Sequence, residues 1–305
     1  PSSLKELLLN ILFCAFDLPA LPPSLEKLEL VSTTVRGGVL PTLPASLKRL
    51  QCEGCDLTEL PADLPRSLVS LDCMRNELSA LPTPLPPQLS ALYCSGNGLQ
   101  ALPDLPSTLA HLFCDQNSLT SPLPALPVSL KVFDCSKNQL QSLPTLPLGL
   151  VQLGCTSNEL VSLPTPLPPG LLDLACNDNR LSELPALPAS LEHLHCSGNV
   201  LRIIDALPDQ LKHVCCARNF LRVLPVLPPT LKELNCAAQL YGMDRLPATL
   251  PAHLEMLDCS NNNLECLPPL PNTLKTLSCQ GNCLSRTSSE FYDTDDCSDY
   301  DELSE

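Results

Sequence analysis

A cysteine recurs at an almost constant interval through most of this chain, and that period restricts the possible folds more than any other feature. Successive members of this cysteine column lie 21, 21, 20, 21, 20, 21, 20, 20, 20, 23 and 20 residues apart. The column consists of Cys52, Cys73, Cys94, Cys114, Cys135, Cys155, Cys176, Cys196, Cys216, Cys236, Cys259 and Cys279. Leu9 and Leu30 hold the same place in two earlier, degenerate units, which makes 14 repeats. Such a period predicts a stack of small, similar structural units.

Each repeat reads approximately L-P-x-L-P-x-x-L-x-x-L-x-C-x-x-N-x-L, and the segment from Leu187 to Leu201 is a clean copy. The second leucine and the cysteine of L-x-x-L-x-C are two positions apart, so both point inward from one short strand. A period of 20 or 21 residues leaves no room for a return helix. The L-P-x-L-P segments, which explain why the chain holds 34 prolines, instead favour an extended, polyproline II back.

The predicted fold class is therefore a repeat solenoid, the leucine-rich-repeat horseshoe, over residues 1–285. About 14 repeats of 20–23 residues are expected to place short parallel β-strands on the concave face and extended segments on the convex back. At roughly 4.8 Å between neighbouring strands, the inner arc is expected to measure about 65 Å.

A second column lies three residues after the cysteines and is mostly asparagine. A buried amide there can bond to backbone groups of its own turn and of the neighbouring turn, which would otherwise stay unsatisfied. We therefore interpret these asparagines as structural. Cys55 stands in this column once, and Thr33, Leu12 and Gln239 depart from it. Its asparagines are Asn76, Asn97, Asn117, Asn138, Asn158, Asn179, Asn199, Asn219, Asn262 and Asn282.

The cysteine column has two interpretations. Neighbouring strands bring cysteines within the Cα separation of a disulfide, but in-register parallel strands aim the Cβ bonds the same way and strain the near-90° torsion. We favour buried free thiols that act as small hydrophobic side chains. Because unpaired thiols persist most easily in a reducing compartment, we expect the protein to work in the cytoplasm.

Charge separates a tail from the repeats. The chain carries a net charge of −15, which opposes nucleic-acid phosphates and anionic membranes, so we expect neither as a partner. Residues 286–305 hold eight acids and one arginine, and we expect them to be a disordered acidic tail. The tail either improves solubility and shields the last strand edge or is a regulated peptide, with Thr287, Tyr292, Ser298 and Tyr300 as phosphorylation candidates.

The leucine–proline segments Leu143–Pro147 and Leu184–Pro188, each followed by the asparagine position, resemble the LPX-type repeats of secreted effectors from Gram-negative pathogens, the YopM and IpaH type. The resemblance extends over residues 4–285. Cysteine where many such effectors carry Val or Ile is a departure. The resemblance implies a concave face that holds a host protein, and entry into host cytoplasm by type III secretion. Some members are scaffolds, and others add a C-terminal ubiquitin-ligase domain with a catalytic Cys-x-Asp.

The triplet Cys297-Ser298-Asp299 matches that catalytic pattern by letter, but it lies in the acidic tail with no surrounding domain to lower a thiol pKa. We therefore predict a non-enzymatic protein-binding scaffold without a cofactor. Two alternatives stay open. One is the substrate-recognition part of a ubiquitin ligase whose catalytic domain lies outside this chain. The other is a bacterial surface or structural leucine-rich-repeat protein.

Function is expected on the outward positions of the strands, because the inward columns are committed to packing. An aromatic patch, made of Tyr93, His111, Phe113, Val132 and the adjacent Ala91, is one candidate. Aromatic side chains on a concave polar face are typical anchors of protein interfaces, although scattered surface apolar residues are the plain alternative. The flanking aspartates favour a basic partner segment, and they are Asp72, Asp115 and Asp134.

A histidine patch, made of His193, His195, His213 and Cys215, is the other candidate. Lateral neighbours on adjacent strands lie about 5 Å apart, so these groups are expected to converge. A zinc site, adventitious metal affinity and a solvated polar patch are the alternatives. We favour the polar patch, because no short ligand spacing supports a metal. Clustered histidines also permit pH-dependent partner binding.

One repeat is longer than the rest and contains the extra segment Tyr241–Arg245 before Cys259. This insertion is either neutral drift or a lateral contact site.

Overall fold

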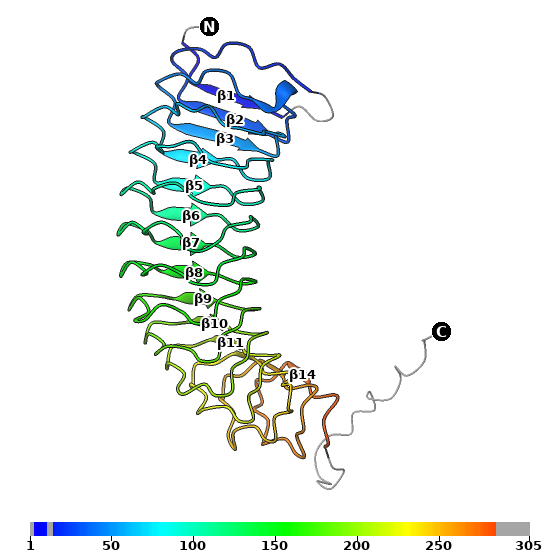
Figure 1. Ribbon diagram of the computed structural model, residues 1–305. Coiled ribbons are helices and arrows are strands. Elements are labelled where there is room, and N and C mark those ends of the chain that lie inside the picture. Colours follow the sequence, from blue (N-terminus) through cyan, green and yellow to red (C-terminus); the bar gives the residue numbers. More distant parts are fainter. Residues whose placement is uncertain (1–2, 11–14, 285–305) are drawn as a thin grey trace.

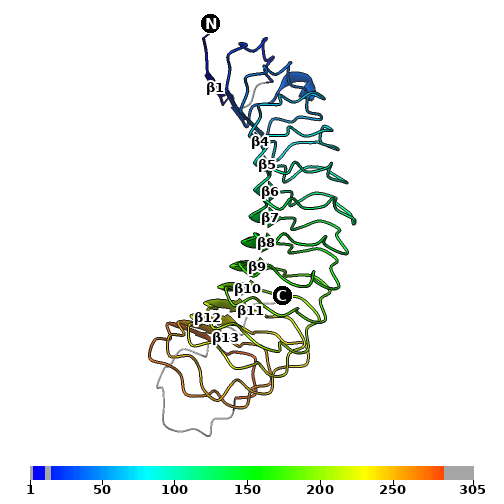
Figure 2. The ribbon, with the colours of Figure 1, turned by 90° about the vertical axis from the view of Figure 1, so that its left-hand side faces the viewer.

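The computed structural model describes residues 3–10 and 15–284, which form one curved solenoid (Figure 1). Fourteen strands pair in sequence order into a single parallel sheet. Figure 2 shows the strands along the inner side of the curve and the connecting segments along the outer side. The strands are β1 Glu6–Leu9, β2 Lys27–Val31, β3 Arg49–Glu53, β4 Ser70–Asp72, β5 Ala91–Tyr93, β6 His111–Phe113, β7 Val132–Asp134, β8 Gln152–Gly154, β9 Asp173–Ala175, β10 His193–His195, β11 His213–Cys215, β12 Glu233–Asn235, β13 Met256–Asp258 and β14 Thr276–Ser278. In the described ranges the one helical element is the 3-10 turn η1, Arg36–Gly38.

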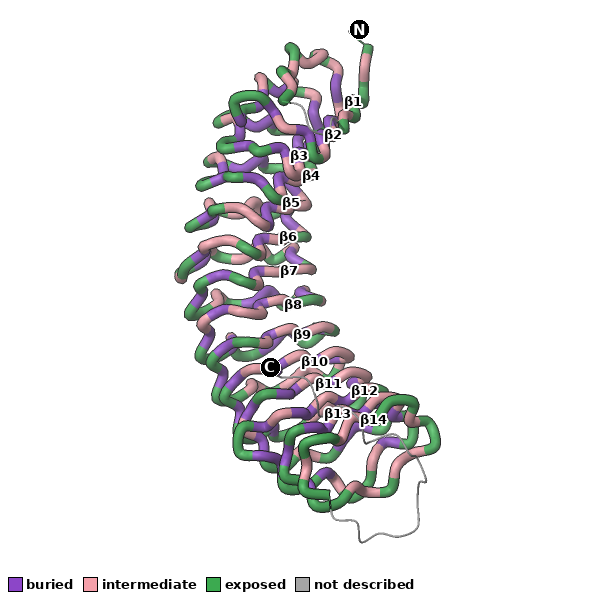
Figure 3. The backbone as a smooth tube through the Cα atoms, turned by 90° about the vertical axis from the view of Figure 1, so that its right-hand side faces the viewer, coloured by how far each residue is buried: buried purple, intermediate pink, exposed green. Residues whose placement is uncertain are grey.

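The predicted inward and outward alternation is confirmed in every strand from β4 to β13. The middle residue of each strand is buried, and the residues on either side of it are half-buried or exposed. These middle residues are leucines except for Phe133 in β7 and Val214 in β11. Buried stretches recur from turn to turn along the whole solenoid (Figure 3). One continuous hydrophobic core therefore runs behind the sheet.

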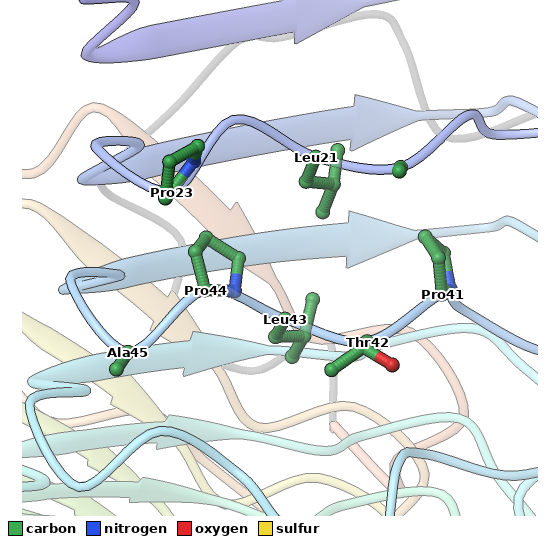
Figure 4. Close-up of a pocket in the computed structure, with 8 residues that line it drawn as sticks. Leu21, Pro23, Pro41, Thr42, Leu43, Pro44 and Ala45 are labelled. Carbon is green, nitrogen blue, oxygen red and sulfur yellow. The ribbon is translucent and has the colours of Figure 1, made fainter. Parts of the chain in front are cut away.

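Differences in repeat length are absorbed outside the sheet. The longest repeat separates β12 from β13, yet Glu233 still pairs with Met256. The extra residues lie in the connecting segments, which form no helix and no strand in this part of the described chain. On the convex back the proline-rich segments that precede β2 and β3 run side by side, and a groove lies between them (Figure 4). Its lining includes Leu21, Pro23, Leu43 and Pro44.

The cysteine column is almost entirely buried and holds no disulfide, as predicted. Eleven of its twelve members have no exposed surface, and Cys279, which follows the last strand, is partly exposed. No cysteine in residues 15–284 is joined in a disulfide within that range. Column thiols donate to backbone carbonyls of the next strand, as from Cys52 Sγ to Asp72 O at 3.3 Å and from Cys114 Sγ to Asp134 O at 3.4 Å. The thiols thus link strands by weak hydrogen bonds in place of covalent bridges.

The asparagine column forms a ladder of buried hydrogen bonds. Asn158 Nδ2 donates to the carbonyl of Cys155 in its own repeat at 3.1 Å and to that of Cys135 in the previous repeat at 3.0 Å. Asn158 Oδ1 accepts from the backbone N–H of Leu140 at 3.0 Å. Each asparagine therefore satisfies polar groups of two turns at once, which confirms its structural interpretation.

Gln239 makes the same bonds as the asparagines. Its interpretation from the sequence as a departure from the column was therefore wrong in structural terms. Its Oε1 accepts from Leu221 N at 2.9 Å, and its Nε2 donates to the carbonyls of Cys216 and Cys236 at 3.0 and 3.1 Å. Thr33 and Cys55 instead donate from their own Oγ1 and Sγ to nearby carbonyls. Leu12 lies outside the described residues.

A second ladder, six residues before the cysteine column, was not anticipated from the sequence. Ser67 Oγ lies 2.7 Å from the carbonyl oxygens of both Ala45 and Leu47 in the previous repeat. Equivalent bonds come from Ser24, Ser46, Thr108, Ser129, Ser190, Thr230 and Thr273. This hydroxyl ladder joins the turns just before each strand begins.

Residues 286–305, which the sequence assigns to an acidic tail, lie outside the described residues, and so does Cys297. Among residues 3–10 and 15–284, the structure contains no helix of the length and apolarity needed to cross a membrane.

We expect the column thiols to resist alkylation in the folded protein. Burial raises the pKa of Cys176, Cys216 and Cys259 to about 12. Near pH 8 only about one such thiol in ten thousand is the reactive thiolate. Iodoacetamide labelling followed by peptide mass spectrometry should modify the exposed Cys266 and Cys283 first.

Unfolding the same sample in guanidinium provides the control, because all the described cysteines should then react. Alkylation of a column cysteine in the folded protein as fast as that of Cys266 would contradict this account.

An unfolded thiol ionises near pH 9.0, below the folded value of about 12, so the free energy of unfolding should fall as pH rises through that interval.

Candidate functional site

The sheet aligns the outward side chains into rows across the concave face. Register places Asp72 beside Tyr93, Tyr93 beside Phe113, and Phe113 beside Asp134. A parallel row brings Ala91, His111 and Val132 together, with His111 exposed and Val132 half-buried. The structure thus brings together all five residues of the aromatic patch.

Tyr93 and Phe113 stack on each other. Their ring centroids are 5.2 Å apart and their ring planes differ by 17°. The separation is close to the strand spacing of about 4.8 Å, because the two rings project to the same side from adjacent in-register strands. Both side chains are half-buried, so the outer edges and faces of the stack remain open to solvent. An aromatic surface of this kind adds about 1 kcal/mol of ring–ring stabilisation beyond burial.

Fixed carboxylates flank the stack. Asp72 Oδ1 accepts from the backbone N–H of Met74 at 3.1 Å, and Asp134 Oδ1 accepts from Ser136 N at 2.9 Å. Burial raises the pKa of Asp72 above its ordinary value. Asp115 Oδ1 is bonded to the Ser95 hydroxyl. The aromatic patch therefore has an acidic rim held by the strand ends.

Gly154 provides the space for one of these carboxylates. A Cβ atom at this position would come within 2.7 Å of Asp134 Oδ1. The glycine in β8 therefore permits Asp134 to lean away from Phe113 along the sheet.

The histidine patch also assembles as the spacing predicted. His193 and His213 stack with ring centroids 4.7 Å apart and ring planes 10° apart. His213 Nδ1 lies 3.0 Å from Glu233 Oε2, and register places His193 beside Asp173. On the next outward row His195 lies beside Cys215.

These groups do not form a metal-binding set. Within the described ranges, no cluster of three or more His, Cys, Asp or Glu side chains is arranged to hold a metal ion. The rings of His193 and His213 stack face to face, so the nitrogens of the two rings lie in nearly parallel planes. Cys215 Sγ lies 3.0 Å from Ser197 Oγ, and burial lowers the pKa of His195. The patch is a half-buried polar surface on β10 and β11.

The two patches are separate along the concave face. Tyr93 and Phe113 belong to β5 and β6, whereas His193 and His213 belong to β10 and β11. Four strand spacings lie between β6 and β10, which is about 20 Å. A partner that contacts both patches must therefore extend along the solenoid.

Comparisons with protein-family models and with curated proteins give no match. Solved structures do match. YopM from Yersinia enterocolitica WA-314 has a TM-score of 0.86 and 41% sequence identity over 92% of this chain. The chain spans 61% of the length of that protein. YopM from Yersinia pestis, a leucine-rich effector protein, gives a TM-score of 0.79 and 35% identity over 88% of this chain and 75% of its own.

A third structure shares the fold. The functional domain of InlJ from Listeria monocytogenes, which includes a cysteine ladder, has a TM-score of 0.77 and 24% identity. The match covers 85% of this chain and 59% of that one. At this identity the likeness concerns the solenoid architecture alone.

Proposed function

Because the chain belongs to the YopM-type family of leucine-rich-repeat proteins, we propose that it is a non-enzymatic scaffold that holds a protein partner on its concave face. The Yersinia pestis relative is an effector, which supports an effector role and a host protein as the partner. The column of free, buried thiols supports work in a reducing compartment, such as the cytoplasm of a host cell.

One observation carries the proposal: the stacked pair Tyr93 and Phe113 presents its open ring surface on the concave side of the sheet. Aromatic side chains held in one orientation lose little conformational entropy on binding, and they are enriched among the residues that dominate interface energies. The neighbouring His111 and Val132 widen this surface, and Asp134 adds negative charge. The best-fitting partner segment is therefore apolar with basic residues at its margin.

The histidine patch extends the proposed contact surface. His193, His195 and His213 face the same concave side as the aromatic patch. A partner that reaches both patches gains a second, polar contact region on β10 and β11.

The variant Tyr93→Ala/Phe113→Ala is expected to weaken partner binding at least about 100-fold, because two central aromatic anchors are lost. Partners captured from host-cell lysate by the wild-type protein are identified, purified and titrated by calorimetry. The matched control is Thr276→Ala, an exposed concave position on β14 far from the patch.

Equal melting temperatures of the two variants and the wild type would show that both remain folded. Undiminished affinity of the double variant, with a normal melting temperature, would exclude the aromatic patch as the binding site. Equal loss in the Thr276→Ala control would instead indicate a contact spread over the whole face.

A further inference from the structure

We propose that one lateral flank of the solenoid is a docking surface for the chain's own acidic segment, residues 290–302. The flank patch is formed by the turns that follow Cys196, Cys216 and Cys236, away from the concave face. Docking of residues 290–302 on the flank patch does not depend on the proposed partner binding at the concave face. Three observations carry the inference: an apolar surface, unpaired arginines within it, and a complementary segment within reach.

The apolar surface occupies two neighbouring columns. Four residues after the column cysteine stand Val200, Phe220 and Leu240, and seven residues after it stand Ile203 and Val223. Leu240 is 68% exposed and Ile203 is 67% exposed. In the seven repeats from Cys52 to Cys176, these two positions hold only charged or polar residues, glycine or alanine. The apolar surface is thus confined to one part of the flank.

Backbone hydrogen bonds place these residues in adjacent turns. Val200 N donates to Leu181 O at 3.0 Å, Phe220 N to Leu201 O at 2.8 Å and Leu240 N to Asn219 O at 2.7 Å. The Phe220 ring meets the ring of Tyr241 edge-on, with centroids 5.3 Å apart. Tyr241, from the inserted segment, is 58% exposed and extends the same surface.

Arginines lie among the apolar side chains. The flank segments 198–203, 218–223 and 238–245 contain four arginines and one aspartate, in a chain of net charge −15. Arg202 and Arg222 stand six residues after their column cysteines, between the two apolar columns. Arg218 pairs with Asp178 at 3.2 Å. By contrast, no carboxylate of the described residues lies within ion-pair distance of Arg202, Arg222 or Arg245.

The acidic segment has the complementary chemistry. Residues 290–302 carry seven acidic side chains and no basic one, and they include Phe291, Tyr292 and Tyr300. Aromatic side chains suit the apolar columns, and the acids suit the arginines between them. An anionic membrane is a poorer occupant, because the net charge of the whole chain repels it at longer range.

The segment is within reach of the flank patch. Leu284 stands five residues after Cys279 and therefore leaves the array on the same flank. The turns of Cys236 and Cys196 lie two and four repeats away, which corresponds to about 10 to 20 Å. Residues 285–290 span up to about 20 Å when extended. Phe291 and Tyr292 can thus contact the flank patch of their own chain.

Photo-crosslinking of the full chain tests the proposal. With Phe291 replaced by benzoylphenylalanine, irradiation at low salt should join residue 291 to peptides that contain 198–203, 218–223 or 240–245. The charge reversal Arg202→Glu/Arg222→Glu should lower the yield about tenfold, and high salt should lower it as well. The control reversal Arg66→Glu/Lys137→Glu changes two exposed cations elsewhere and should leave the yield unchanged.

Four results would overturn the proposal. Crosslinks that map to the concave strands, or that are equally frequent in both charge reversals, would show that the flank patch is not the site. Crosslinks between isotopically labelled and unlabelled chains would assign the surface to a second copy. Capture of anionic vesicles that depends on Arg202 and Arg222 would assign it to a membrane. A single-chain crosslink lost only in Arg202→Glu/Arg222→Glu supports the proposal.

Discussion

Replacing Phe133 with alanine is expected to lower the free energy of unfolding by about 4 kcal/mol, because it empties a space in the centre of the core. Phe133 is the largest fully buried side chain of the described residues, and register places it between Leu112 and Leu153. The neighbouring strands are tied into the sheet on both sides, so they cannot move together to fill the cavity. Urea denaturation monitored by circular dichroism measures the loss.

The matched control is Phe133→Leu, because leucine is the usual residue at this position. It leaves a smaller cavity and should cost about 1 kcal/mol. Equal, small losses for the two variants would show that the core around β7 relaxes freely, contrary to the packing described above. Because solenoids can unfold in parts, the denaturant slope of each variant must be compared with that of the wild type.

Replacing Asn158 with alanine is expected to cost about 3 kcal/mol, because it leaves buried backbone groups without partners. The affected groups are the N–H of Leu140 and the carbonyls of Cys135 and Cys155, which belong to two repeats. The side chain itself contributes little packing volume, so the loss measures the hydrogen bonds. Urea denaturation again provides the measurement, together with amide hydrogen exchange at residue 140.

Gln239→Ala gives an independent check of the same ladder, because Gln239 makes equivalent bonds to Leu221, Cys216 and Cys236. It should cost about as much as Asn158→Ala. Fast exchange of the Leu140 amide is expected in Asn158→Ala only. A loss below about 0.5 kcal/mol in both variants would show that water replaces the amide bonds.

The repeat period predicted the fold because a single constraint acts at every turn. Once Cys114 and Cys135 occupy the same inward position, the strands that precede them must be parallel and in register. The same logic predicted the asparagine ladder and the free thiols. The hydroxyl ladder of Ser67 and its equivalents was missed because the same position also holds Gln88, Gly149, Gly170, Gln210 and His253, which hides the column.

The sequence predicts which outward side chains of the candidate site are neighbours across the strands, but not how those side chains contact each other. Register follows from the repeat, so the adjacency of Tyr93 with Phe113 and of His193 with His213 follows too. Ring stacking and the ion pair of His213 depend on side-chain rotamers, which a repeat pattern does not specify. Of the flank patch, only the inserted segment Tyr241–Arg245 departs from the repeat period, so the period alone does not single out the apolar residues in the turns of Cys196 and Cys216.

The ladders have a mechanical consequence. The asparagine, hydroxyl and thiol bonds join a repeat to the one before or after it, so a load applied at the two ends is carried by each junction in series. Because the junctions are loaded in series, the weakest junction between two repeats breaks first. Each released repeat lengthens the chain by about 70 Å, many times its height in the stack. The solenoid can therefore extend under tension by giving up single turns while the remaining turns keep their bonds.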